Sequence, residues 1–142
     1  MPEESKAIVR RFVNEVINRK KLAVFDELVA ANVVAHHVPP GAAPDYQRWK
    51  DTISVFLTAF PDIQISIEDT VAEADRVVIR WTVRGTHQGE LTGIPATGKE
   101  VTFTGMLIYR VADGKIIERW EEMDMMSLMR QLGIIPSAGQ DG

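Results

Sequence analysis

The most informative part of the sequence runs from Arg76 to Asp124 and reads RVVIRWTVRGTHQGELTGIPATGKEVTFTGMLIYRVADGKIIERWEEMD. Apolar and polar residues alternate within it, and successive side chains of a β-strand point to opposite faces of a sheet. The alternation predicts three strands that share one largely apolar face. The residues expected on this face are Val77, Ile79, Trp81 and Val83, then Val101, Phe103, Leu107 and Tyr109, then Ile116, Glu118, Trp120, Glu122 and Asp124.

The last of these strands ends in carboxylates. An ionised carboxylate is costly to bury without a partner, so Asp124 is expected either at a solvated pocket mouth or in a chemical role, with a raised pKa. Glu122 lies two residues earlier, roughly 7 Å away on the same face, where each carboxylate disfavours ionisation of the other. In the alternative interpretation Glu122 is solvated at the rim or pairs with Arg80 or Arg110.

Turn signals separate the strands. Asp113-Gly114 suits the positive φ angles of a type I′ hairpin turn, and the segment before Gly98 is rich in glycine and proline. A further strand is predicted from the alternation of Ile63, Ile65 and Ile67. These neighbouring strands are therefore expected to form an antiparallel sheet.

Helical spacing of apolar residues dominates the first part of the chain. Helices packed on one face of a curved antiparallel sheet define an α+β domain, which we place at residues 1–135, with a disordered tail at 136–142. The helices are predicted at residues 3–19, 22–29 and 45–60, with a β-prone segment at 33–38 and a short closing helix that ends at Gly133.

Composition limits the class of protein. A chain of 142 residues with 45% hydrophobic content fits one domain with a sizeable core. The net charge of -4 argues against a nucleic-acid or anionic-membrane partner. The absence of cysteine removes disulfides and thiolate chemistry, and the sequence has no apolar run long enough for a membrane span. A cytoplasmic protein is the expectation.

A strongly curled sheet leaves a cavity between its concave face and the helices. Aromatic lining with a few polar groups suits a flat, aromatic or polycyclic ligand, although the same aromatics could simply fill a core. The residues expected to line the cavity and bind substrate are Trp81, Phe103, Leu107, Tyr109 and Trp120, together with Val83, Glu122 and Asp124, and opposite them Trp49, Phe56 and either His36 or His37.

The histidines give weaker signals. Alternation allows only one of His36 and His37 to face inward. His87 follows Gly85-Thr86 and is expected either to donate to a substrate oxygen or to cap its own loop. We predict no metal, because ligand spacings such as His-x-x-x-His are absent, and no nucleotide, because no phosphate-binding glycine loop occurs.

Several short motifs carry a resemblance to a known family. The chain resembles the SnoaL-like polyketide cyclases (ester cyclases), of the nuclear-transport-factor-2-like superfamily of cone-shaped α+β barrels. The resemblance covers nearly the whole chain in order. Its motifs are Ala59-Phe60-Pro61-Asp62, Gly85-Thr86-His87-Gln88-Gly89-Glu90, Gly93-Ile94-Pro95-Ala96-Thr97-Gly98, Tyr109-Arg110, Asp113-Gly114-Lys115-Ile116, Trp120-Glu121-Glu122-Met123-Asp124 and Gln131-Leu132-Gly133.

The resemblance implies an intramolecular aldol condensation that closes a ring of a polyketide methyl ester without metal or organic cofactor. It implies that Asp124 is the acid/base of this lyase or isomerase chemistry. The family pattern also has a histidine at the position of His87, and it favours His37 over His36 as the histidine in the pocket. The cyclases usually have a histidine at the position of Glu122, so that residue departs from the pattern.

Two other functions stay open at this point. Glu122 and Asp124 could activate a water between them to hydrolyse an epoxide or ester, or the cavity could hold a ligand without catalysis. Met106, Ile108 and Met123 are expected on the convex face, where apolar residues indicate a partner surface. Since dimers through this face are common in the superfamily, we expect a homodimer.

Overall fold

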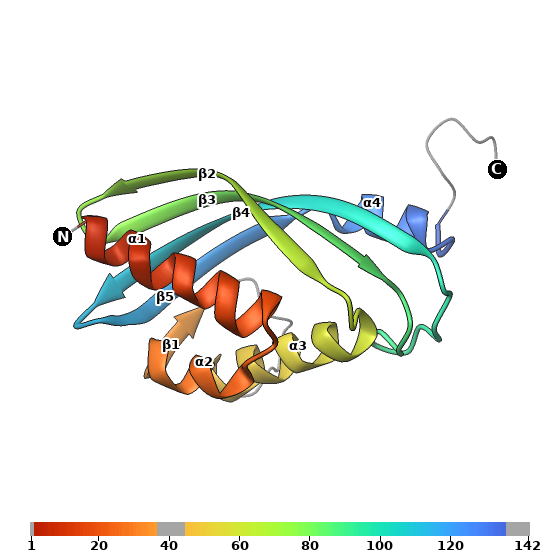
Figure 1. Cartoon of the computed structure of the whole chain (residues 1–142), viewed down its shortest axis with the longest axis horizontal. Helices are drawn as coiled ribbons and strands as arrows, with labels where there is room; N and C mark the ends of the chain where they lie inside the picture. The colour runs from red at the N-terminus through yellow and green to blue at the C-terminus, as the bar shows by residue number, and fades with distance from the viewer. Residues whose placement is uncertain (1, 37–44, 136–142) are drawn as a thin grey trace.

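The structure is a computed structural model that describes residues 2–36 and 45–135 (Figure 1). Helices dominate the first half of the chain and strands the second half, as predicted. The elements are α1 (Pro2–Arg11), its π-helical continuation η1 (Phe12–Asn18), α2 (Leu22–Leu28), β1 (Val29–Ala35), α3 (Asp45–Ala59), β2 (Gln64–Glu73), β3 (Arg76–Thr86), β4 (Glu100–Ala112), β5 (Lys115–Met123) and α4 (Met125–Gln131).

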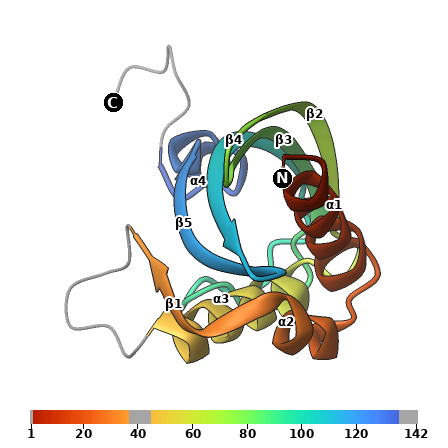
Figure 2. The ribbon, with the colours of Figure 1, turned by 90° about the vertical axis from the view of Figure 1, so that its left-hand side faces the viewer.

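The strands form one sheet in the order β1-β5-β4-β3-β2. Neighbours among β2 to β5 are antiparallel, whereas β1 runs parallel to β5, so the sheet is mixed rather than wholly antiparallel. The long connection from β1 to β5, through α3 and three strands, permits the parallel pairing. The end-on view shows the sheet curling around the helices (Figure 2). The predicted α+β fold is therefore confirmed.

The N-terminal helix buries one face against the concave side of the sheet. Val9, Phe12, Val13 and Val16 are at most 2% exposed, and their spacing of three and four residues gives a single apolar stripe. The ring of Phe12 lies 6.1 Å from that of Tyr109 on β4. This helix therefore forms one wall of the space inside the sheet.

The hairpin between β4 and β5 has the predicted turn. Asp113 and Gly114 have φ angles of 52° and 76°, so both central residues are left-handed, as a type I′ turn requires. The hairpin fixes where β5 begins and, with the irregularity described next, which of its residues face inward.

A β-bulge on β5 changes the face on which its side chains lie. Arg110 of β4 pairs with Glu118, but the next residue, Val111, pairs with Ile116. An advance of one residue along β4 therefore corresponds to two residues on β5, and Ile117 is the extra residue of the bulge. Ile116 is fully buried inside the sheet, whereas Trp120, beyond the bulge, is on the outer face. A slip of one residue moves every later side chain to the opposite face. The prediction of one uninterrupted alternation along this strand is therefore wrong.

Some predictions concern residues that the structure does not describe, or the chain as a whole. His37 and the tail at 136–142 lie outside the described residues, and the single domain at 1–135 stays a prediction. Among the described helices, none is long and apolar enough to cross a membrane.

Candidate active site

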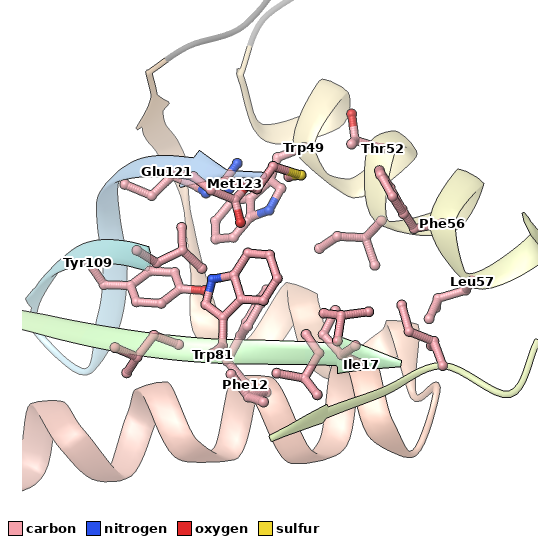
Figure 3. Close-up of a pocket in the computed structure, with 18 of the residues that line it drawn as sticks. Phe12, Ile17, Trp49, Thr52, Phe56, Leu57, Trp81, Tyr109, Glu121 and Met123 are labelled. Carbon is pink, nitrogen blue, oxygen red and sulfur yellow. Dashed lines mark hydrogen bonds and ion pairs between the residues drawn. The ribbon is translucent and has the colours of Figure 1, made fainter. Parts of the chain in front are cut away.

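An apolar cavity of about 110 Å³ lies between the concave face of the sheet, η1 and α3 (Figure 3). β3 and β4 supply its inner wall because their odd-numbered residues face the helices, as the alternation predicts. The predicted lining residues that the structure places around it are Trp49, Phe56, Trp81, Val83, Phe103, Leu107 and Tyr109.

A second, more polar hollow of about 330 Å³ adjoins this cavity near the ends of β1 and β5. We call the first hollow the inner chamber and the second the mouth. Six residues line both, namely Trp49, Thr52, Phe56, Arg119, Glu121 and Met123. The two hollows therefore adjoin, and these shared residues form the boundary between an apolar and a polar part.

An ion pair stands at this boundary. Nη2 of Arg119 donates to Oε1 of Glu121 at 2.5 Å, and the two side chains are 11% and 19% exposed. They face inward because, beyond the bulge, Arg119 pairs with the inward-facing Tyr109 and Glu121 with Leu107. Glu121 is thus a carboxylate in contact with both the apolar chamber and the wetter mouth.

Sequence reasoning missed Arg119 and Glu121 as site residues. The available signal was the pair Ile116-Ile117, two successive apolar residues that interrupt a strict alternation. Such an interruption is where a bulge is expected, but it does not say how far the register moves.

Aromatic packing holds the guanidinium of Arg119 in place. Its Cζ lies 4.7 Å from the ring centre of Trp49, within the range of a cation–π contact. Trp49 in turn packs at 5.1 Å from the rings of both Phe12 and Phe25. The position of the ion pair therefore depends on helix α3, which carries Trp49.

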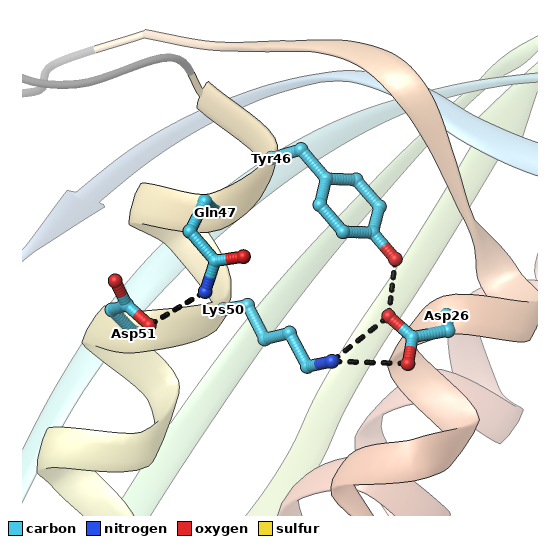
Figure 4. Close-up of polar contacts among 5 residues, drawn as sticks. All are labelled: Asp26, Tyr46, Gln47, Lys50 and Asp51. Carbon is cyan, nitrogen blue, oxygen red and sulfur yellow. Dashed lines mark hydrogen bonds and ion pairs between the residues drawn. The ribbon is translucent and has the colours of Figure 1, made fainter.

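Helix α3 is fixed to α2 by a polar cluster (Figure 4). Tyr46 donates its hydroxyl to Asp26, and Nζ of Lys50 lies 3.0 Å from each carboxylate oxygen of Asp26. Burial, with the hydrogen bond to Asp26, raises the pKa of Tyr46 to about 12. The hydrogen bond from Tyr46 and then the contact with Lys50 hold the pKa of Asp26 below its ordinary value.

Tyr109 places a phenol hydroxyl in the lining of the inner chamber. The residue is 2% exposed, and burial raises the pKa of its hydroxyl well above the ordinary value. The charges of Arg119 and Glu121 act on this hydroxyl in opposite directions. Tyr109 therefore stays neutral at physiological pH and keeps its proton for donation.

Trp81 lies across the backbone of Gly105. A Cβ at Gly105 would stand 2.3 Å from Cζ2 of Trp81 and 2.8 Å from the carbonyl oxygen of Glu122, so the indole fits only because this residue has no side chain. The indole Nε1 has no hydrogen-bond partner among the described residues. Gly105 thus lets the largest side chain of β3 fill one end of the inner chamber.

Asp124 does not enter the cavity. It is an exposed residue between β5 and α4, and its Oδ1 accepts the backbone N–H of Ser127 at 2.9 Å. This contact caps the N-terminus of α4, a role for which aspartate is well suited. The prediction that Asp124 faces the cavity is wrong, because β5 ends at Met123 and the chain turns into a helix.

Trp120 and Glu122 lie on the outer face of the sheet, contrary to prediction. Trp120 stacks on His36 at 4.8 Å, and Glu122 is an exposed residue opposite Met106 that reaches the rim of the mouth. The arginines considered as its partners bind other carboxylates, Arg80 to Asp69 at 2.7 Å and Arg110 to Glu118 at 2.8 Å.

His36 stands at the mouth and belongs to the same outer cluster. Its Nε2 lies 2.7 Å from Oε2 of Glu118. The hydrogen bond with His36, and then the one from Arg110, hold the pKa of Glu118 below its ordinary value. His36 therefore ties the end of β1 to β5 beside the mouth.

His87 is buried away from the cavity. Its Nδ1 accepts the backbone N–H of Thr97 at 3.2 Å and lies 3.0 Å from the hydroxyl of the same residue. Its ring packs 5.5 Å from Phe60. The structure therefore favours the loop-capping interpretation over the predicted contact with substrate.

Metal-binding residues do not gather within residues 2–36 and 45–135. No three of the described histidine and acidic side chains lie close enough together to hold an ion. The polar groups that the cavity does offer are an ion pair, a phenol, a threonine hydroxyl and the indole N–H of Trp81. These groups suit proton transfer and hydrogen bonding to a ligand.

The fold and the cavity define a class of small α+β proteins whose curled sheet encloses a site for an apolar ligand. The family model of the SnoaL-like polyketide cyclases matches residues 7–132, and the chain belongs to this family. No curated protein matches the sequence closely enough to count as a relative.

Solved structures agree with this assignment. AclR of Streptomyces galilaeus, proposed to be a hydroxylase, superposes with a TM-score of 0.86 at 30% identity, over 99% of this chain and 87% of its own. IdmH of Streptomyces antibioticus, proposed to be a polyketide cyclase, gives a TM-score of 0.78 at 31% identity, over 91% and 98%. A proposed polyketide cyclase of Bacillus cereus gives a TM-score of 0.79 at 29% identity, and the match covers 93% of this chain and 82% of that protein.

Proposed function

We propose that this chain is an enzyme that closes a ring in a polyketide-type keto compound by acid/base catalysis, without metal or organic cofactor. The observation that carries the proposal is the Arg119–Glu121 pair, a carboxylate and a guanidinium at the boundary of an otherwise apolar chamber. The family model supports the substrate class. Asp124, expected as the acid/base, caps a helix instead, and Glu121 takes its place in this proposal.

The proposed reaction is an intramolecular aldol condensation. Glu121 removes a proton from the carbon next to a carbonyl, and the enolate carbon attacks a second carbonyl of the same molecule. One carbon–carbon bond forms, one carbonyl π bond breaks, and the proton on Glu121 passes to the resulting alkoxide. Atoms and electrons therefore balance without an oxidant or reductant.

Arg119 and Tyr109 stabilise the developing negative charge in this mechanism. A fixed cation and a neutral hydroxyl act strongly on an enolate oxygen where water is excluded. Glu121 also reaches the mouth, so it can exchange its proton with solvent between turnovers.

The test is turnover of an anthracycline-type polyketide, offered both as its free acid and as its methyl ester, by Glu121→Gln and by the matched variant Glu68→Gln, whose carboxylate is exposed on β2 away from the cavity. We expect Glu121→Gln to lose ring closure by at least about 100-fold, because a positioned base contributes at least that much. Glu68→Gln should keep most of the activity. Equal turnover by Glu121→Gln and the wild type would refute the assignment.

A second candidate, suggested by the similarity to AclR, is hydroxylation of a polyketide ring, an oxidation for which O2 would be the oxidant and would supply the added oxygen atom. Product analysis separates the two reactions, since aldol closure adds no oxygen atom whereas hydroxylation adds one. Hydrolysis by a water held between Glu122 and Asp124 loses its geometric basis, because Asp124 is outside the cavity. A ligand-binding protein without catalysis would bind the ester and return it unchanged.

A further inference from the structure

The two parts of the cavity differ in size and chemistry, and this difference limits what each part can hold. The inner chamber measures about 110 Å³, while an engineered apolar cavity of about 150 Å³ holds a single benzene ring. A polycyclic compound therefore does not fit inside the inner chamber. Only one ring or a short branched alkyl group can enter it, and the rest of the ligand must extend into the mouth.

The walls of the inner chamber favour an apolar group. Away from the boundary they are made of aliphatic and aromatic side chains from η1, α3 and the concave sheet face, such as Val13, Ile53, Val83 and Phe103. Among the described residues inside the chamber, only the hydroxyl of Tyr109 and the indole N–H of Trp81 are donors, so an oxygen atom beyond their reach loses its hydration without a partner, which is unfavourable. The charged donor, the guanidinium of Arg119, is at the boundary.

The mouth presents a cation, Arg48, without a carboxylate partner among the described residues. Arg48 lies one helical turn before Thr52 on α3, and both line the mouth. The other basic side chains there have carboxylate partners, Glu121 for Arg119 and Glu118 for His36. Among the described residues that line the mouth, Arg48 is the one cation for which the structure gives no carboxylate partner. Arginine binds carboxylates well because its planar guanidinium donates two parallel hydrogen bonds.

We propose that the substrate is an amphipathic keto acid that binds with its apolar end inward. A single ring or short alkyl group occupies the inner chamber, the reacting carbonyl lies at Arg119 and Glu121, and a carboxylate in the mouth binds Arg48. This inference rests on the proposed function for the role of the central carbonyl. The two ends of the ligand are assigned from the chambers themselves.

Binding of β-benzoylpropionate tests the inner end. This compound carries one phenyl ring, a ketone and a carboxylate, and calorimetry can compare it with the larger β-naphthoylpropionate. We expect the phenyl compound to bind roughly 10-fold more tightly, since the second ring has no room. The bigger apolar group would otherwise bind better, so this order is diagnostic.

Two variants change the volume of the inner chamber in opposite directions. Val83→Phe fills it and should weaken binding of the phenyl compound by at least roughly 10-fold, whereas Phe103→Leu enlarges it and should improve binding of the naphthyl compound. Val71→Phe, at a position 63% exposed on β2, is the matched control and should change neither affinity. Tighter binding of the naphthyl compound by the wild type, or unchanged affinities in both chamber variants, would overturn the assignment of the inner end.

Arg48→Gln tests the outer end. It should weaken binding of β-benzoylpropionate roughly 10-fold and leave the affinity for its methyl ester unchanged, because the lost contact involves the carboxylate. Arg10→Gln removes the same charge from the exposed side of α1 and should have no effect. Equal losses for acid and ester, or none for either, would overturn this part.

These binding measurements are independent of turnover. In a Glu121→Gln background, Arg48→Gln and the chamber variants are expected to change the affinity for β-benzoylpropionate by the same factors as in the wild type, because neither Arg48 nor the apolar walls depend on the charge of Glu121. A failure of the Arg48 and chamber predictions would therefore leave the catalytic assignment of Glu121 standing, and a failure of that assignment would leave the ligand orientation standing.

Discussion

Arg119 and Glu121 hold opposite charges inside a largely apolar space, where each charge alone is unfavourable. Their side chains are 11% and 19% exposed, so water screens them only in part. A buried ion pair adds little net stability, but removal of one partner leaves an uncompensated charge. Each member of the pair therefore depends on the other.

Replacement of Arg119 should expose this dependence. Arg119→Met is expected to lower the free energy of unfolding by about 3 kcal/mol, since Glu121 then has no counter-charge. The double variant with Glu121→Met should recover most of this loss, because the remaining side chains are apolar. Urea unfolding of the single and double variants measures both effects. A double variant as unstable as Arg119→Met would show that packing against Trp49, rather than charge, is responsible.

At the scale of single residues, part of the site could be predicted from sequence. Period-two alternation correctly placed Trp81 and Tyr109 on the inner face, because β3 and β4 pair without interruption in this region. It failed for Glu121 and Asp124, because one bulge reverses the side on which β5 presents its residues. A bulge depends on pairing with a neighbouring strand, and this information is absent from the residues of one strand alone.

At the scale of elements, the position of α3 controls the width of the mouth. Tyr46 and Lys50, both on α3, meet at Asp26 on α2. Tyr46 also packs edge-on against Phe25 at 5.2 Å, and Phe25 contacts Trp49. A disturbance at Asp26 therefore has a direct path of contacts to the guanidinium of Arg119.

Tyr46→Phe removes the hydroxyl but keeps the ring. We expect a loss of about 1 kcal/mol in the free energy of unfolding at neutral pH, typical of one hydrogen bond to a partly exposed carboxylate. A double-mutant cycle with Asp26→Asn should show non-additive losses, since both changes remove the same contact. Strictly additive losses would mean that the hydrogen bond contributes nothing to the stability of the protein.

The contact between β1 and β5 should depend on pH. Since the folded state lowers the pKa of Glu118, the ion pair stabilises the protein above the ordinary pKa of the free carboxyl and stops doing so as pH falls through the lowered value. Glu118→Gln should therefore be about 1 kcal/mol less stable than the wild type at pH 7, and the difference should shrink at pH values below about 4. Chemical unfolding across this range measures it. A difference that stays as large below about pH 4 as at pH 7 would contradict the contacts with His36 and Arg110.

Helices and strands were predictable where their apolar periods are long and uninterrupted. The patterns of β3, β4 and α3 each agree with the structure, and the Asp113-Gly114 turn fixed the hairpin between β4 and β5. The parallel pairing of β1 with β5 was not predictable, since the residues of an edge strand such as β1 do not indicate the direction of the strand with which it pairs. Element type follows from local chemistry, whereas pairing follows from the assembled molecule.

At the scale of the whole molecule, the outer face of the sheet remains a predicted dimer surface. Met106 is 52% exposed there, and Ile108 is partly exposed beside it. Met123, expected on this face, lines the cavity instead because of the bulge. We expect a homodimer at micromolar concentration in sedimentation experiments.

Met106→Glu should shift this equilibrium toward monomer, since a charge on the apolar face opposes its burial. Val55→Glu, at a position 39% exposed on helix α3, serves as the matched control and should remain dimeric. A wild-type monomer at these concentrations, or a Met106→Glu dimer as stable as the wild type, would contradict the assignment of this face.

The central claim is that the cavity holds one working acid/base group and that this group is Glu121. Its most direct measurement is the exchange of hydrogen for deuterium next to the ketone of β-benzoylpropionate methyl ester in heavy water, followed by NMR. We predict exchange by the wild type and by Asp124→Asn at similar rates, and a rate at least about 100-fold lower for Glu121→Gln. Exchange that survives in Glu121→Gln but disappears in Asp124→Asn would contradict it.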